Sequence, residues 1–205
     1  DVTARLRRVF NTRRIGHGGT LDPMATGVLP VFVGRATRGV EFFEHAEKTY
    51  ETVLRLGLTT DTEDVWGETI EEHPVEFTEE KLQQVLESFR GEILQIPPMY
   101  SALKVNGQKL CDLARKGKEV ERKPRPITIH ELTLLEVGEN TLRLRVKCSK
   151  GTYIRTLCKD IGEALGCGGC MAQLRRVTAG EYTIGESVPL QQLLETETPE
   201  IYHVP

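Results

Sequence analysis

The sequence predicts an α+β fold, because patterns typical of strands and patterns typical of helices alternate along the 205-residue chain. Apolar and polar side chains alternate with a period of two over residues 48–57 and 142–148, as in strands with one covered face. Apolar residues recur at helical spacing over 82–89 and 154–165, as in helices that pack one face on a core. With 39% hydrophobic and 28% charged residues, the chain has the composition of a globular domain with a substantial core.

The first forty residues predict an amphipathic helix, a glycine-rich loop and a strand. Residues 1–14 place apolar side chains on one face at near-helical spacing and arginines on the others. The stretch 16–27 (GHGGTLDPMATG) surrounds Asp22 with glycines and a proline, so its backbone turns sharply. Asp22 is either a turn residue that bonds nearby backbone N–H groups or a reactive carboxylate that a tight loop presents. Residues 28–33 are apolar and predict a buried strand.

The next elements are a strand, an acidic loop and a helix. The strand covers 48–57, and the loop 57–67 is polar and acidic, without the glycine and glutamate spacing of a calcium-binding EF-hand. We expect Thr78 to cap a helix whose apolar stripe ends at Phe89, with Gly91 closing it.

Residues 101–126 differ from their surroundings, because they are rich in lysine and arginine. A hairpin turn is expected at Asn106-Gly107, followed by a short helix over 110–116. Such a basic segment suits contacts to RNA phosphates, which position RNA without reading its sequence. It is equally compatible with an inert surface loop.

The last third of the chain predicts strands and two further helices. Strands are expected from 127–129 toward 134–135 and over 142–148, followed by a helix over 154–165 that Gly166 ends. Arg155 lies in the first turn of that helix, where the dipole slightly disfavours a cation, so an anionic partner is indicated. A short helical stretch is expected at 189–195.

The net charge of −3 is unevenly distributed. Residues 1–40 carry seven arginines against two acids, and residues 99–130 carry eight basic residues against three acids, whereas residues 41–98 hold fifteen acids against four bases. Two basic blocks can form a positive face for nucleic acid, although charge runs also occur as ordinary solvated surface. With no long apolar segment, we expect a cytoplasmic protein with no membrane contact.

The five cysteines do not indicate a metal or redox site. Cys167-Gly-Gly-Cys170 lacks the second pair that a structural zinc site needs, and it follows a helix, unlike a thioredoxin motif. We therefore expect reduced, structural thiols and no metal or cofactor.

Three segments of the chain carry recognisable motifs: the loop GHGGTLDPMATGVLP, the segment Lys48-Thr49-Tyr50 before an apolar strand, and SKGTYIRTL (149–157). They resemble, in this order, the catalytic, second and third motifs of the pseudouridine synthases of the TruB family. The segment Leu174-Arg175-Arg176 is similar to its L-R-R segment. The resemblance covers about residues 1–195 in the order of the family.

The resemblance implies an activity, a fold and a set of site residues. Family members isomerise a uridine to pseudouridine in the T arm of transfer RNA (position 55) without metal or cofactor. Their fold is a mixed, mostly antiparallel sheet flanked by helices, with a thumb-like insertion that corresponds to about 99–126. The resemblance implies three catalytic candidates: Asp22 as nucleophile, Tyr50 beside the base, and Arg155 paired with Asp22. The substrate-binding candidates that it implies are His17, Tyr50, Lys150, Tyr153 and Leu174. The arginines after Leu174 are expected to favour RNA binding.

The chemistry fits these residue types. Isomerising uridine breaks the glycosidic C–N bond and joins the ribose to carbon 5 of the same ring, which one carboxylate nucleophile can do without a redox change. The carboxylate can attack the anomeric carbon or carbon 6 of uracil, and the sequence does not distinguish them. The base must leave its stack, so an apolar pocket from Tyr50, Tyr153 and Leu174 is expected, with His17 supporting the flipped-out state.

Residues 1–195 are expected to form the catalytic domain and 196–205 a tail. Relative to the family, the first strand and a complete C-terminal RNA-binding domain are missing, which puts full activity of this chain in question. We expect a monomer that binds the T stem-loop of tRNA. Two alternatives stay open: the catalytic subunit of an RNA-guided box H/ACA synthase, and a non-catalytic tRNA-binding or tRNA-folding protein.

Overall fold

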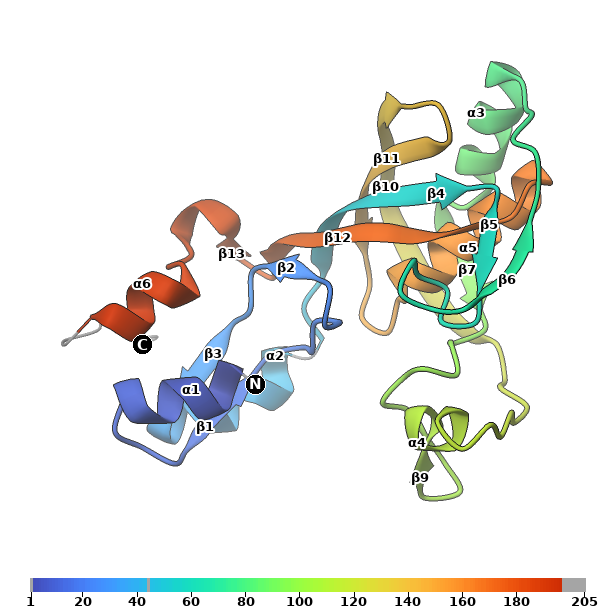
Figure 1. Cartoon of the computed structure of the whole chain (residues 1–205). Coiled ribbons are helices and arrows are strands. Elements are labelled where there is room, and N and C mark those ends of the chain that lie inside the picture. Colours follow the sequence, from blue (N-terminus) through green and yellow to red (C-terminus); the bar gives the residue numbers. More distant parts are fainter. Residues whose placement is uncertain (1, 44, 197–205) are drawn as a thin grey trace.

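The computed structural model describes residues 2–43 and 45–196, and it contains one large sheet with helices packed on it. Seven strands form this sheet in the order β13-β12-β4-β11-β10-β7, with β2 pairing beside β12 (Figure 1). The pairing of β2 with β12 is parallel and the other pairs are antiparallel. The strands are β2 (Thr26–Gly27), β4 (Lys48–Leu56), β7 (Gly91–Gln95), β10 (Arg125–Val137), β11 (Thr141–Cys148), β12 (Gly169–Ala179) and β13 (Tyr182–Thr183).

Two helices cover one face of this sheet and enclose the core. They are α3 (Glu79–Ser88) and α5 (Ile154–Leu165), and their apolar stripes join the inward residues of the strands in a single cluster. Along β4 the residues alternate between buried and partly exposed, so that Tyr50, Leu54 and Leu56 face the helices. The predicted α+β class and the mostly antiparallel sheet are therefore confirmed, and the described helices of the core lie on one face of it.

Several local predictions are also confirmed. The Thr78 hydroxyl accepts a hydrogen bond from Lys81 N at 3.1 Å and caps α3, and Gly166 ends α5. In the insertion, β8 (Lys104–Val105) and β9 (Gln108–Lys109) form a hairpin in which Asn106 and Gly107 both have positive φ, as a type I′ turn requires. The short helix that follows is α4 (Leu110–Ala114).

The N-terminal segment forms a separate small layer beside the sheet (Figure 1). Helix α1 (Val2–Val9) buries Leu6 and contacts α6 (Leu190–Glu195), so both terminal helix predictions are confirmed. The other elements of this layer are β1 (Ile15–His17), β3 (Val31–Val33), η1 (Gly34–Gly39) and α2 (Val40–Phe43), and η2 (Ile184–Glu186) precedes α6. The predicted tail, 196–205, lies outside the described residues apart from Thr196.

Three local predictions are wrong. The strand predicted over 28–33 is limited to β3, which pairs with β1 outside the large sheet, because Pro30 cannot donate to a ladder and Val28 bonds to Arg176. The acidic loop 57–67 begins with β5 (Leu58–Thr60), which pairs with the exposed, charged strand β6 (Thr69–Glu72). Gly91 does not cap α3; it begins β7, an edge strand that the sequence did not indicate.

Candidate active site

The glycine-rich loop places Asp22 against the start of α5, where it forms an ion pair with Arg155. Arg155 Nε lies 2.9 Å from Asp22 Oδ2, and Arg155 Nη2 lies 3.3 Å from Asp22 Oδ1, so the guanidinium binds both carboxylate oxygens. The arginine side chain is 6% exposed and the aspartate side chain 33% exposed. The pair therefore holds a carboxylate in one orientation while leaving part of it open to a substrate.

Arg155 is fixed by further acceptors that the sequence did not reveal. Its Nη1 donates to Thr62 O at 3.0 Å and its Nη2 donates to Tyr100 O at 2.8 Å, while Asp64 Oδ2 lies 4.0 Å from its Nε. These partners come from the acidic loop and from the start of the insertion. The sequence shows the acidic segment 61–64 (DTED), but its contact with Arg155 is formed only in the folded chain.

The acidic loop is itself fastened to the sheet and to α5. Thr156 Oγ1 donates to Glu63 Oε2 at 2.5 Å, and the backbones of Glu63 and Val65 exchange hydrogen bonds with Met171 of β12. Burial raises the pKa of the Glu63 carboxyl, which the Thr156 hydrogen bond and Lys159 partly oppose. The loop that presents Thr62 and Asp64 to Arg155 is thus a rigid part of the site.

Tyr50 lies inside the sheet next to this pair. It is 9% exposed, and burial raises the pKa of its hydroxyl; Arg176 lowers that pKa, whereas Cys148 and Asp22 raise it. In the sheet, Tyr50 of β4 lies directly opposite Arg176 of β12. Sequence reasoning identified Tyr50 but expected Arg176 to contact RNA, whereas the structure buries Arg176 to 1% exposure.

Tyr153 and Leu174 come from two different elements, the start of α5 and the strand β12. Tyr153 is the residue before α5, and its backbone N–H and carbonyl both bond to the buried side-chain amide of Gln95, at 2.8 and 3.0 Å. Burial raises the pKa of its hydroxyl. Leu174 is 7% exposed and lines a cavity of about 700 Å³ together with Met24, next to the Asp22 loop.

The other two binding candidates have no described contact with Asp22. His17 ends β1, and its Nδ1 is buried without a hydrogen-bond partner. Lys150 lies in the turn before α5, exposed, with its Nζ 2.6 Å from His45 Nδ1. Both lie on segments next to the site, but the structure does not bring either side chain to the Asp22 carboxylate.

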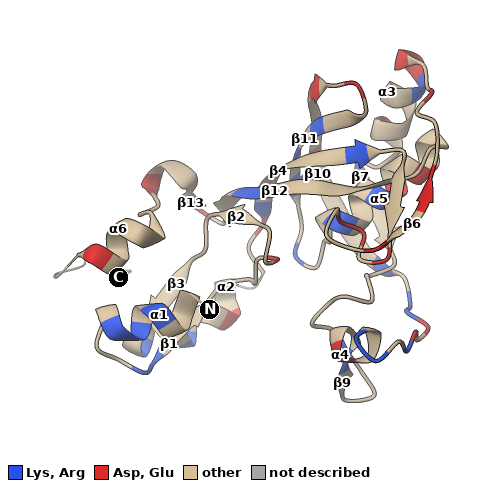
Figure 2. Cartoon of the chain, in the orientation of Figure 1, with Lys and Arg blue, Asp and Glu red and all other residues tan. Residues whose placement is uncertain are grey.

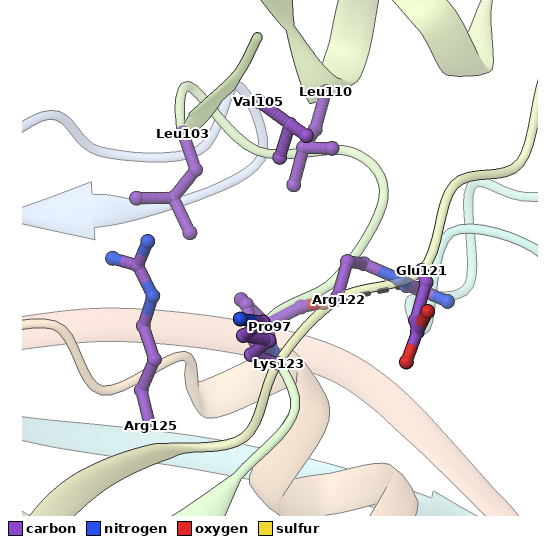
Figure 3. Close-up of a pocket in the computed structure, with 8 residues that line it drawn as sticks. All are labelled: Pro97, Leu103, Val105, Leu110, Glu121, Arg122, Lys123 and Arg125. Atoms are coloured by element: carbon purple, nitrogen blue, oxygen red, sulfur yellow. Dashed lines mark hydrogen bonds between the residues drawn. The ribbon is translucent and has the colours of Figure 1, made fainter.

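A small cavity of about 200 Å³ lies where the insertion meets the sheet (Figure 3). Leu103, Val105 and Leu110 line it from the insertion, and Arg125 faces them from the start of β10. Arg122 Nη1 donates to Pro97 O at 3.3 Å, and this hydrogen bond links the segment that enters the insertion to the segment that leaves it. The junction is thus apolar inside and basic at its rim.

Basic side chains are concentrated on the two segments that flank the site. Figure 2 shows lysines and arginines along α1 and in the insertion around α4, whereas acidic residues gather near α3 and β6. None of the arginines of α1, which are Arg5, Arg7 and Arg8, forms an ion pair with the acids that the structure describes. The charge blocks of the sequence therefore correspond to separate regions of the molecule.

All five cysteines are free, and four of them are buried, as expected of structural thiols. Over residues 2–43 and 45–196, no helix is both long enough and apolar enough to cross a bilayer.

Two family models match consecutive parts of the chain. Residues 7–154 match the TruB family pseudouridylate synthase (N terminal domain), and residues 155–200 match the tRNA pseudouridylate synthase B C-terminal domain. Among curated relatives, the tRNA pseudouridine synthase B of Francisella tularensis subsp. novicida (strain U112) is 52% identical over 194 residues, which are 94% of this chain and 64% of that protein. The same-named protein of Stutzerimonas stutzeri (strain A1501) is 51% identical over 189 residues, 92% of this chain and 62% of that protein.

Solved structures of related proteins have the same fold. A crystal structure of a Cbf5-Nop10-Gar1 complex contains a chain with a TM-score of 0.69 and 34% identity, over 89% of this chain and 45% of that one. The archaeal box H/ACA sRNP Nop10-Cbf5 complex gives a TM-score of 0.67 and 31% identity, over 95% of this chain and 48% of that one. This chain spans less than two thirds of the length of the curated relatives described above.

Proposed function

Because the chain belongs to the TruB family of pseudouridylate synthases, we propose that it isomerises a uridine to pseudouridine in the T arm of tRNA (position 55). In this proposal Asp22 is the nucleophile, Arg155 holds its carboxylate and Tyr50 lies against the base. The observation that carries the proposal is the two-point pairing of the buried Arg155 with a partly open Asp22 in the glycine-rich loop.

The proposed chemistry uses this geometry directly. A carboxylate that is held by a bidentate arginine attacks in a fixed orientation, which lowers the entropy cost of reaching the reacting carbon. The uridine must leave its stack to reach Asp22, and Tyr50, Tyr153 and Leu174 supply aromatic and apolar surface for it. His17 and Lys150 are proposed to assist binding from the neighbouring segments.

We further propose that residues 1–195 act as one catalytic unit, with the insertion at about 99–126 closing on the T stem-loop. The boundary between the two family models falls inside α5, which packs against β4 and β12, so no structural boundary separates Asp22 from Arg155. The free cysteines suit a reducing, cytoplasmic compartment. We also propose a monomer.

An RNA-guided activity is the second candidate, and it is favoured by one observation. The two solved structures described above are Cbf5 complexes, one of them described as a box H/ACA sRNP. The identity to them is 31–34%, whereas the identity to the tRNA pseudouridine synthase B proteins is 51–52%, which supports the stand-alone activity.

The test is tritium release from a T stem-loop RNA labelled at carbon 5 of uridine, because forming the new C–C bond removes that hydrogen. The parent chain is expected to release tritium without guide RNA, and Asp22→Ala is expected to release none while still binding the RNA. Glu72→Gln, which removes an exposed carboxylate on β6, is the matched control and should retain full activity. Binding without release by the parent chain would favour the non-catalytic tRNA-binding alternative or a requirement for a guide RNA.

A further inference from the structure

The most unusual charged group outside the described ion pair is Arg176 on β12. It is 1% exposed, and no carboxylate of the described chain forms an ion pair with it. Moving a cation from water into the protein interior is strongly unfavourable unless hydrogen bonds inside the protein replace those to water. Its bonding partners therefore indicate what the charge is retained for.

The guanidinium of Arg176 spans the two ends of the Asp22 loop. Its Nη2 donates to Gly19 O at 3.0 Å, before Asp22, and its Nε donates to Val28 O at 2.7 Å, after Asp22. The Arg176 carbonyl in turn accepts from Val28 N at 2.9 Å. One residue thus fixes both ends of the segment that carries the proposed nucleophile.

The same guanidinium reaches Tyr50 on the neighbouring strand. Arg176 and Tyr50 lie directly opposite each other in the antiparallel pairing of β12 with β4, so their side chains project from the same face of the sheet, and Arg176 lowers the pKa of the Tyr50 hydroxyl, which burial raises. Arginine has donors only, so in a hydrogen bond between these two side chains the Tyr50 oxygen is the acceptor. In such a bond the hydroxyl hydrogen of Tyr50 points away from Arg176.

We propose that Arg176 is a positioning residue that fixes the Asp22 loop and the Tyr50 hydroxyl relative to each other and sets the direction in which that hydroxyl donates. The proposal rests on the proposed function, because it assigns Arg176 a role in the arrangement of Asp22 and Tyr50. It also replaces the expectation that this arginine contacts RNA, since its side chain is inside the protein.

The first measurement is the single-turnover rate of tritium release at saturating RNA for Arg176→Met and Arg176→Lys. Displacing a reacting group by about 1 Å commonly costs about 100-fold in rate, so Arg176→Met is expected to lose about that factor, with RNA affinity within about threefold of the parent. Arg176→Lys keeps a charge but cannot reach all three acceptors, so we expect an intermediate rate. The matched control, Arg55→Met on the exposed face of β4, should keep the parental rate.

A double-mutant cycle with Tyr50→Phe separates positioning from a loss of structure. If Arg176 acts through the Tyr50 hydroxyl, Arg176→Met costs much less rate in the Tyr50→Phe background than in the parent. Losses that simply multiply would overturn the proposal. If Arg176→Met does not fold, as judged by circular dichroism, the cycle is run with Arg176→Lys and the same outcomes apply.

Ultraviolet titration of tyrosinate tests the contact without any enzymatic activity. The groups that face Tyr50 are Arg176, Cys148 and Asp22, with the buried Lys48 on the same strand. Removing the cation should move the Tyr50 transition, identified by its absence in Tyr50→Phe, to higher pH. An unchanged transition would refute the contact, whereas an inactive parent chain with a shifted transition would refute only the proposed function.

Discussion

Arg155→Lys tests how far the geometry of the arginine, beyond its charge, supports the site. The guanidinium makes four hydrogen bonds, two to Asp22 and one each to Thr62 O and Tyr100 O. A lysine ammonium donates from a single nitrogen and cannot span these acceptors, so we expect at least two bonds to be lost. At about 1.5–3 kcal/mol for a hydrogen bond to a charged group, and allowing for water at the partly exposed Asp22, the expected destabilisation is about 3 kcal/mol.

The assay combines thermal unfolding with single-turnover tritium release. For a domain of this size, about 3 kcal/mol corresponds to a Tm lowered by roughly 6–12 °C. The rate is expected to fall by about 100-fold, because the Asp22 carboxylate loses its two-point contact. The matched control is Arg143→Lys, whose ion pair with Glu51 is half exposed on the arginine side and is expected to contribute less than about 1 kcal/mol.

A Tm within about 2 °C of the parent, together with a rate within about threefold, would refute this reasoning. It would mean that the charge alone orients Asp22. A lowered Tm with an unchanged rate would mean that the Thr62 and Tyr100 contacts stabilise the fold without affecting the proposed nucleophile.

Two further predictions concern the loop and the helix that meet at this site. Gly27 has a φ of 105°, and a Cβ at this position would overlap Arg176 O, so Gly27→Ala should lower the free energy of unfolding in urea by at least about 2 kcal/mol. The control is Gly117→Ala, at a φ of 65° in open space, which should lower it by about 1 kcal/mol or less. Equal losses of stability would contradict this account. Burial raises the pKa of Asp160 to about 6, a shift that Lys159 opposes and Glu163 and Glu63 reinforce. A carboxyl whose pKa is raised in the folded protein contributes stability at pH values below its pKa in the unfolded chain, and this stability is lost as the pH rises through about 6. Asp160→Asn should therefore raise the Tm relative to the parent at pH 7.5 but not at pH 4. The same Tm difference at both pH values would disprove the assignment.

The sequence predicted most elements whose signal is local. The period-two alternation of β4 and β11, the Thr78 cap and the Asn106-Gly107 turn depend on neighbouring residues, and all are present. Strand β7 was missed because Ile93 is its sole apolar side chain that packs against the core, which gives no readable alternation. Its place in the sheet is decided by its partner β10, about thirty residues later in the chain.

For the candidate site, too, the sequence predicted the residues with a local signal and missed the contacts that form only on folding. Motif resemblance identified Asp22 and Arg155, and an arginine in the first turn of a helix independently indicated an anionic partner. The acceptors on Thr62 and Tyr100 are backbone carbonyls, and no residue pattern reveals where a carbonyl points. These contacts required the folded chain.

Arg176 is a different case, because a signal for its burial was present in the sequence. In a strand, residues two apart lie on the same face, so Arg176 shares the face of Leu174 and Arg175 lies on the other. The structure follows this alternation, with Leu174 and Arg176 buried and Arg175 exposed. A basic residue two positions from a buried leucine in a strand is therefore better interpreted as a hydrogen-bonding group inside the protein than as an RNA contact, and here it bonds to both ends of the Asp22 loop.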